Sequence, residues 1–374
     1  MRLSFLSTLY ERPGPWASVH LDTGRTAEST PARRELQARE ACGALRRQGA
    51  DEATGQAVYE ALTGEPGPAG GAGRAVFAAG GQVVLDRPLA TAPPTAVDTR
   101  WSALPRVAPL LDLAAQAPVC LVAYIDRIGA DLEVRTPLGR RSAGQAQGLD
   151  WPVHRAGRDE LSDSHFQRSV ENTWEHNAEE VAKAIVTCQE EAHADVIVLA
   201  GDVRERRSVH RRLPAGLQDR VVESGHGGRA EGASAKLLDE DVKRAAEEHV
   251  RRSAAAGLDR FRSAHETAAE GVRPLVDAAR EHRIAELFVC PEGGDTHREV
   301  WVGPEPDQVA VRRSDAHYLG EMHPSSARAD DALLRSAAMT GAPAQVVHID
   351  GVGSVPAGGL GALLRWPSHD GGHQ

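Results

Sequence analysis

Two carboxylates stand where predicted strands end, and carboxylates are suited to hold a divalent cation. Asp126 follows the apolar run 119–125, and Asp202 follows the run 195–200. A carboxylate pair there could bind Mg²⁺ for nuclease chemistry. The sequence offers no third or fourth acid in a matching context, and aspartate is also a common turn and cap residue. We therefore expect both side chains to cap turns, and we predict no metal site.

Three histidines, His154, His165 and His176, recur at intervals of 11 residues. On a helix the last two would lie about 16 Å apart, too far to share a metal ion, so surface positions are expected. Gly351 and Gly353 follow a predicted strand, but a third glycine and a following helix are missing, which favours a loop over a dinucleotide site. No Gly-x-Ser-x-Gly or Walker sequence occurs, and we predict no cofactor.

Gly80, Gly81 and Gln82 combine two glycines with a side-chain amide. Apolar runs of β type, 74–79 and 82–86, lie on either side of the two glycines. This pattern is typical of a β-hairpin, because a two-residue primed turn requires positive φ angles that glycine adopts at little cost. The tripeptide is therefore predicted to be a turn.

Arginines gather in two polar stretches. The first, 135–158, holds five arginines against one acid, and the second, 204–229, holds seven against three. Such charge runs are either solvated loops or contacts for RNA phosphates. Between them, 159–202 holds eleven acids against two basic residues, so that segment should avoid RNA or face a protein. The candidate contacts are Arg140, Arg141, His154, Arg155, Gly157, Arg158, Arg206, Arg207, Arg211 and Arg212.

The composition limits the class of protein. The chain has 374 residues, a formal net charge of -10 and 41% hydrophobic residues, enough for two or three domain cores. The acidic balance argues against general binding of DNA or of an acidic membrane. Cys42, Cys120, Cys188 and Cys290 lie far apart, which fits reduced thiols rather than a zinc site. Without a signal peptide or a long apolar stretch, the protein is expected to be soluble and cytoplasmic.

The apolar patterns predict an α/β protein of three domains, 1–110, 111–240 and 241–374. The first combines a strand, a helix pair and the hairpin. The middle domain has a strand pair, a polar projecting loop at 139–159, a long helix from about 162 to 192, and another strand. Alternating helices and strands predict an α/β/α sandwich for the last domain.

This order of parts resembles the bacterial branch of the archaeo-eukaryotic class-I release factor family. That branch includes the Balon-type ribosome hibernation factors and a dormancy-associated actinobacterial protein. The resemblance spans nearly the whole chain and rests on domain order together with the segments VIVLAG, EGVRPLVDAAREHRIAELFV, DDALLRSAAMTGAPAQVVHI and GLGALLRW. It implies a tRNA-shaped protein that binds the ribosome.

In that family a Gly-Gly-Gln tripeptide, placed in the loop before the long helix, hydrolyses peptidyl-tRNA. Here that place is held by residues 154–159, where Gly157 matches one family glycine and Arg158 falls near the glutamine. The Gly-Gly-Gln at 80–82 lies in another domain, and the stop-codon motif Asn-Ile-Lys-Ser is missing. The resemblance therefore implies loss of both decoding and hydrolysis.

The implied role is occupancy of the ribosomal A site during stress or dormancy. The implied partners are rRNA of the A site and of the peptidyl-transferase region, with elongation factor Tu as a companion. Two alternatives stay open. One is a ribosome-rescue peptidyl-tRNA hydrolase with a divergent loop, which changes at Gly157 or Gln82 would inactivate. The other is a stress scaffold that binds protein and not RNA.

Overall fold

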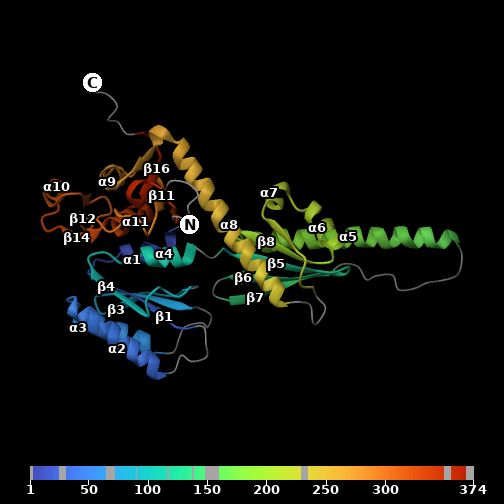
Figure 1. Cartoon of the computed structure of the whole chain (residues 1–374), viewed down its shortest axis with the longest axis horizontal. Helices are drawn as coiled ribbons and strands as arrows, with labels where there is room; N and C mark the ends of the chain where they lie inside the picture. The colour runs from blue at the N-terminus through green and yellow to red at the C-terminus, as the bar shows by residue number, and fades with distance from the viewer. Residues whose placement is uncertain are drawn as a thin grey trace. The chain divides into compact units, whose positions relative to one another are not determined.

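The computed structural model describes residues 3–24, 31–64, 72–89, 91–115, 118–136, 139–147, 160–228, 235–348 and 355–367. It is a mixed α/β protein, as predicted (Figure 1). The chain forms two compact units, the first made of Met1–Gln116 and Arg252–Gln374 and the second of Ala117–Arg251. Within the described ranges no helix has the length and apolar character of a membrane span. The predicted three-domain partition stays a prediction.

An antiparallel sheet of four strands, ordered β3-β2-β1-β4, begins the first unit. Helices α2 (Pro31–Arg47) and α3 (Glu52–Thr63) cover one of its faces, as the predicted helix pair requires (Figure 1). Ala17, Val19 and Leu21 pack with these helices, because alternate side chains of a strand share one face. The strands are β1 (Trp16–Asp22), β2 (Gly73–Ala79), β3 (Gln82–Leu89) and β4 (Val97–Ser102).

The predicted hairpin between β2 and β3 is confirmed. Gly80 and Gly81 have φ angles of 56° and 77°, in the region that favours glycine. The Gly81 N–H donates to Thr54 Oγ1 at 2.9 Å, and Arg12 Nη1 donates to Gln82 Oε1 at 2.9 Å. The Gly-Gly-Gln is therefore a turn whose backbone and amide are held by neighbouring elements.

Two more sheets, ordered β10-β16-β11-β15 and β13-β12-β14, complete the first unit. Their strands are β10 (Ala268–Glu270), β11 (Ile284–Val289), β12 (Glu299–Val302), β13 (Val309–Ala310), β14 (Ser325–Arg328), β15 (Ala344–Val346) and β16 (Leu360–Leu364). Besides α2 and α3, the α-helices that lie wholly in this unit are α1 (Ser7–Tyr10), α4 (Ala108–Ala115), α9 (Val272–Arg280), α10 (Arg313–Tyr318) and α11 (Ala329–Met339), and the end of α8 (Ala235–Ser263) also belongs to it.

One hydrophobic core joins the two ends of the chain inside this unit. It contains Trp16 and Phe77 from the N-terminal sheet, Leu111 from α4, Leu275 from α9 and Leu333 from α11. All five side chains are nearly or fully buried. Segments more than 200 residues apart in sequence therefore depend on the same packing.

The second unit is built on a five-stranded sheet, ordered β7-β6-β5-β8-β9. Helix α5 (Glu160–Ala192) buries Val181 and Ile185 against one face, and α8 (Ala235–Ser263) buries Leu238 and Val242 against the other. The strands are β5 (Cys120–Ile125), β6 (Gly129–Thr136), β7 (Gly139–Gln147), β8 (Val196–Gly201) and β9 (Val221–Ser224). The predicted strand pair, long helix and following strand are confirmed.

Two segments of this unit differ from expectation. The stretch 139–147, predicted as part of a polar loop, is the edge strand β7, whose side chains are mostly exposed on both faces. A strand exposed in this way shows no apolar alternation. The stretch 203–212, also predicted as a loop, is helix α6 (Val203–Arg212), because Asp202 caps its start and arginine is a good helix former.

Candidate nucleic-acid interface

The strand-end carboxylates serve the backbone, as expected. Asp202 Oδ1 accepts from the Arg204 N–H at 2.9 Å and so begins α6. Asp126 Oδ1 accepts from the N–H groups of Ile128 and Gly129 at 2.8 and 2.9 Å. Both carboxylates therefore act as caps rather than as a cation pair.

Helix α6 presents three exposed arginines on one face. Arg204, Arg207 and Arg211 are spaced by three and four residues, which brings their side chains to the same side of a helix. Arg211 Nε donates to the Arg207 carbonyl at 3.2 Å, and within the described part of the chain none of the three pairs with a carboxylate. We call these residues the α6 arginine face. Its unpaired charges are available to an anionic partner.

The other predicted arginines of α6 are occupied. Arg206 is only 6% exposed and donates to the Ser224 carbonyl, which fastens α6 to the end of β9. Arg212 Nη1 donates to Ser208 Oγ at 2.7 Å and to the Ser208 carbonyl at 3.0 Å. Of these four predicted contacts, Arg206 and Arg212 are therefore engaged. Arg207 and Arg211 are exposed and, among the described residues, have no ion-pair partner.

The two arginines of β7 also differ from one another. Arg140 Nη2 donates to Asp239 Oδ2 at 2.7 Å, and Arg135 Nη1 donates to Asp239 Oδ1 at 2.7 Å. Burial opposes the charge of Asp239, but the two guanidinium groups outweigh it and lower the pKa of that carboxyl. Arg141 is exposed, and among the described residues it has no ion-pair partner. Of these two arginines, only Arg141 resembles the α6 arginine face in being exposed without an ion-pair partner among the described residues.

The predicted tip residues His154, Arg155, Gly157 and Arg158 lie outside the described residues. Their assignment as ribosome contacts stays a prediction. The described part of α5 is acidic on its solvent side, where Glu175, Glu179 and Glu190 are exposed. That this acidic surface avoids RNA or faces a protein stays a prediction.

Sequence reasoning missed a serine, a histidine and an aspartate that the fold brings together after β9. Asp241 Oδ2 accepts from Ser224 Oγ at 2.6 Å and lies 3.0 Å from His226 Nδ1. In a nucleophilic triad the histidine stands between serine and aspartate, whereas here the aspartate binds both. The cluster therefore fastens the segment after β9 to α8, and the hydrogen bonds from Ser224 and His226 lower the pKa of Asp241.

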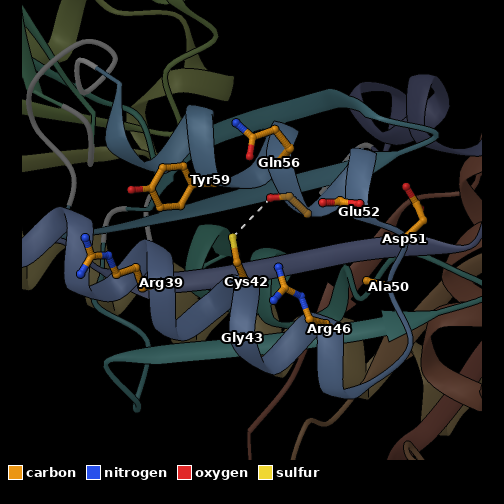
Figure 2. Close-up of a pocket in the computed structure, with 10 residues that line it drawn as sticks. Arg39, Cys42, Gly43, Arg46, Ala50, Asp51, Glu52, Gln56 and Tyr59 are labelled. Carbon is orange, nitrogen blue, oxygen red and sulfur yellow. Dashed lines mark hydrogen bonds between the residues drawn. The ribbon is translucent and has the colours of Figure 1, made fainter.

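A cavity of about 360 Å³ between α2 and α3 contains the half-buried Cys42 (Figure 2). Its Sγ donates to the Gly55 carbonyl at 3.3 Å. Burial raises the pKa of this thiol, against a smaller opposing effect of Arg46. A thiol that stays protonated is a poor nucleophile, so Cys42 is a packing contact between the helices.

Several solved structures are similar to this chain. Dom34 of S. cerevisiae, a translation termination-like factor involved in RNA quality control pathways and interacting with Hbs1, is 11% identical with a TM-score of 0.39. The match covers 69% of this chain and 66% of Dom34, just under two thirds of its length. Pelota of Archaeoglobus fulgidus is 12% identical with a TM-score of 0.33, covering 97% and 92%. A model of ribosome-bound archaeal Pelota and ABCE1 is 13% identical with a TM-score of 0.40, covering 98% and 94%.

The sequence comparisons give relatives over the whole chain and a family over its middle. Two Mycobacterium tuberculosis proteins, Uncharacterized protein MT2704 of strain CDC 1551 / Oshkosh and Uncharacterized protein Rv2629 of strain H37Rv, are each 29% identical over 377 residues. Each match covers 98% of this chain and 97% of the relative. Residues 119–267 match the model of bacterial archaeo-eukaryotic release factor family 2. This segment, which holds the five-stranded sheet, α5 and the α6 arginine face, is therefore similar to the bacterial archaeo-eukaryotic release factor family.

Proposed function

We propose that this protein binds the ribosome, occupies its A site during stress or dormancy, and does not hydrolyse peptidyl-tRNA. The observation that supports this most is the setting of the Gly-Gly-Gln at 80–82. Hydrolysis needs an unobstructed backbone that can place a water beside the ester. In the hairpin, Thr54 holds the Gly81 N–H and Arg12 holds the Gln82 amide oxygen, so neither group is free for that role.

The proposed partner is rRNA of the A site and the peptidyl-transferase region, with elongation factor Tu as a companion. The match of residues 119–267 to the release factor family supports the ribosome as the partner. The α6 arginine face supports contact with phosphates, because exposed arginines that bind RNA phosphates release the counterions condensed on the RNA. The tip residues Arg155 and Arg158 complete the proposed contact. The net charge of -10 restricts such contact to these basic places.

Co-sedimentation with ribosomes at rising salt tests the proposal. Changing Arg207 and Arg211 to Glu should weaken ribosome binding at least about tenfold and reduce the slope of log affinity against log salt by about 2, because two phosphate contacts are lost. The matched control changes Arg46 and Arg47 to Glu, since these are exposed arginines on α2 that the proposal does not use. An equal loss of ribosome binding in both variants would mean that the net charge of the protein, and not the α6 arginine face, determines binding.

A peptidyl-tRNA hydrolysis assay separates occupancy from rescue. We expect ribosomes carrying labelled peptidyl-tRNA to keep the peptide when this protein binds. Peptide release by the wild-type protein that is abolished in Gly157→Val would instead establish the rescue hydrolase. Peptide release that is abolished in Gln82→Ala would show that the turn at 80–82 is itself a catalytic loop. Binding without release supports the proposal.

A further inference from the structure

A histidine with a carboxylate on each side of its ring joins two segments that lie far apart in the sequence. His348 follows β15, and its Nε2 lies 3.0 Å from Asp112 Oδ1 of α4. Its Nδ1 lies 2.9 Å from Glu292 Oε1, in the turn after β11. All three residues belong to the first unit, and the proposed ribosomal role makes no use of their contact.

The two contacts require a positively charged imidazole. A neutral imidazole has one N–H and can donate to one of the two carboxylates, while its other nitrogen presents a lone pair to the second carboxylate. The imidazolium has two N–H groups and can donate to both. Hydrogen bonds between charged groups are also about twice as strong as those between neutral groups. The geometry around His348 therefore fits its protonated form.

The electrostatic surroundings of His348 favour that charge. The hydrogen bond to Asp112 raises the pKa of His348 to about 9, burial opposes this rise, and the hydrogen bond to Glu292 adds to it. Asp112 from α4 and Glu292 from the turn after β11 are the charged groups that face His348 in the described part of the chain. The geometry and the local charges therefore agree on an imidazolium near neutral pH.

The Glu292 carboxylate is itself held in place. Its Oε2 accepts from Cys290 Sγ at 3.2 Å, and the Cys290 N–H donates to the Gly359 carbonyl at 2.8 Å. Burial opposes the charge of Glu292, but the hydrogen bonds from His348 and Cys290 outweigh it and lower the pKa of that carboxyl. Burial and the hydrogen bond to Glu292 raise the pKa of the Cys290 thiol to about 11. Because carboxyl groups are ordinarily ionised above pH 6, His348 is the group of this cluster that changes charge between pH 6 and pH 10.

Helix α4 is the last helix of the first unit before the chain passes into the second. It ends at Ala115, and the second unit begins at Ala117. Leu110 and Leu111 of α4 are buried in the core of the first unit, and this apolar packing does not depend on pH. Asp112 adds an attachment that does depend on pH, because its partner is an imidazole.

We propose that Asp112, His348 and Glu292 form a proton-dependent clasp, which fastens α4 to the ends of β11 and β15 while the imidazole is charged and loosens when it loses its proton. The folded state holds this proton more tightly than the unfolded state, in which histidine has a pKa of about 6.5. The stabilisation is therefore fully present below pH 6.5 and is lost as the pH rises through about 9. Its size is modest, because the side chains of Asp112 and His348 are 24% and 29% exposed and water screens the pair.

A double-mutant cycle on the full chain tests the clasp. Wild type, Asp112→Asn, His348→Gln and the double variant are unfolded in urea at pH 7 and at pH 10. At pH 7 the unfolding constants should show a coupling of about fivefold between the two positions, and at pH 10 this coupling should fall below about twofold, because the imidazole is then neutral. A packing contact between neutral groups would give the same coupling at both pH values. No coupling at pH 7, or an equal coupling at pH 10, would overturn the proposal.

The titration of His348 itself is a second measure, which does not depend on the stability of a variant at pH 10. In NMR spectra of the histidine rings, the signal that is missing in His348→Gln should titrate near pH 9 in the wild type and at least about one pH unit lower in Asp112→Asn. His317→Gln is the matched control, because His317 is an exposed histidine of the same unit without an ion pair in the described ranges, and its loss should leave this titration unchanged. A midpoint near pH 6.5 in the folded wild type would contradict the clasp. Both measurements use the purified chain, so they are independent of the ribosomal role.

Discussion

His20 is a histidine that its surroundings keep neutral. It lies in β1, is 1% exposed, and contacts the Phe77 ring edge-on with ring centroids 5.6 Å apart. Its Nε2 has no hydrogen-bond partner, and Asp98 lies 4.0 Å from its Nδ1. Burial lowers the pKa of His20 to about 4, although Asp98 acts in the opposite direction. Protonation therefore places a charge in the N-terminal core whose burial cost the attraction of Asp98 does not offset.

The stability of the protein should fall as pH drops from 6.5 toward 4, in part because of His20. The unfolded state takes up a proton in this range while the folded state does not, so the free energy of unfolding falls by about 2 kcal/mol between pH 7 and pH 5. His20→Leu should remove this part of the dependence. Urea titrations at both pH values measure it, with the exposed His317→Gln as control. An identical pH dependence in His20→Leu and wild type would contradict the assignment.

The candidate interface shows what residue counting can and cannot predict. The excess of arginine at 204–229 indicated the segment that carries the α6 arginine face, but it gave no means of separating Arg207 from Arg206. The helical period separates them, because neighbours in a helix point about 100° apart. Counting also gave no reason to include Arg204, which completes the α6 arginine face, among the predicted contacts. Once the segment is known to be helical, the spacing of its arginines identifies the exposed face.

At the scale of elements, the outer edge of β4 is closed by a side chain. Strand β4 is an edge strand of the N-terminal sheet, and in the described ranges no strand pairs with its outward N–H and C=O groups. Gln48, just after α2, takes that place: its Nε2 donates to the Thr99 carbonyl at 3.1 Å, and its Oε1 accepts from the Trp101 N–H at 2.8 Å. One amide therefore imitates a short stretch of neighbouring strand.

Gln48→Ala should open this edge. We expect a loss of about 1 kcal/mol in the free energy of unfolding, since two hydrogen bonds are exchanged for water, and more self-association through the exposed edge. Light scattering against concentration and urea titration measure the two effects. Gln56→Ala is the control, because within the described segments the Gln56 amide bonds to Glu60 alone, on the surface of α3. If the Gln48 variant stays monomeric and as stable as wild type, the amide does not protect the edge.

Elements with one buried face could be predicted from the sequence, and those without one could not. The helix pair and α5 carry apolar residues at the helical period, whereas β2 of the hairpin and β8 are nearly continuous apolar runs, because both of their faces are buried. Strand β7 is exposed on both faces and β9 has only four residues, so neither leaves a pattern to detect. The Gly-Gly turn was predictable because its geometry demands glycine, independently of burial.

At the scale of the molecule, the first unit is made from the two ends of the chain. A buried charge cluster lies where they meet: Arg106 Nη1 is 2.8 Å from Asp330 Oδ2 and 3.2 Å from Asp331 Oδ1. The Val107 N–H also donates to Asp331 Oδ1, at 3.1 Å. Burial and the neighbouring Asp330 raise the pKa of Asp331, an effect that Arg106 opposes. Arg106 therefore makes this close pair of acids tolerable in the core.

Arg106→Leu should unfold the two ends of the chain together and spare the middle. Removing the guanidinium leaves Asp331 buried without an ion pair, while Arg328 still pairs with Asp330, and such a buried unpaired carboxylate costs about 3–5 kcal/mol. Because β1 and β11 belong to one compact unit, the amides of both strands should lose protection from hydrogen exchange, while those of β8 in the second unit keep it.

The control is Ile185→Ala, a change at a fully buried residue of the second unit, which should lower protection in β8 and leave it unchanged in β1 and β11. Adding Asp331→Asn to Arg106→Leu should restore part of the loss, since it removes one unpaired charge. Loss of protection in β1 alone would mean that the ends fold as independent domains, and the shared core would then contribute little to their stability.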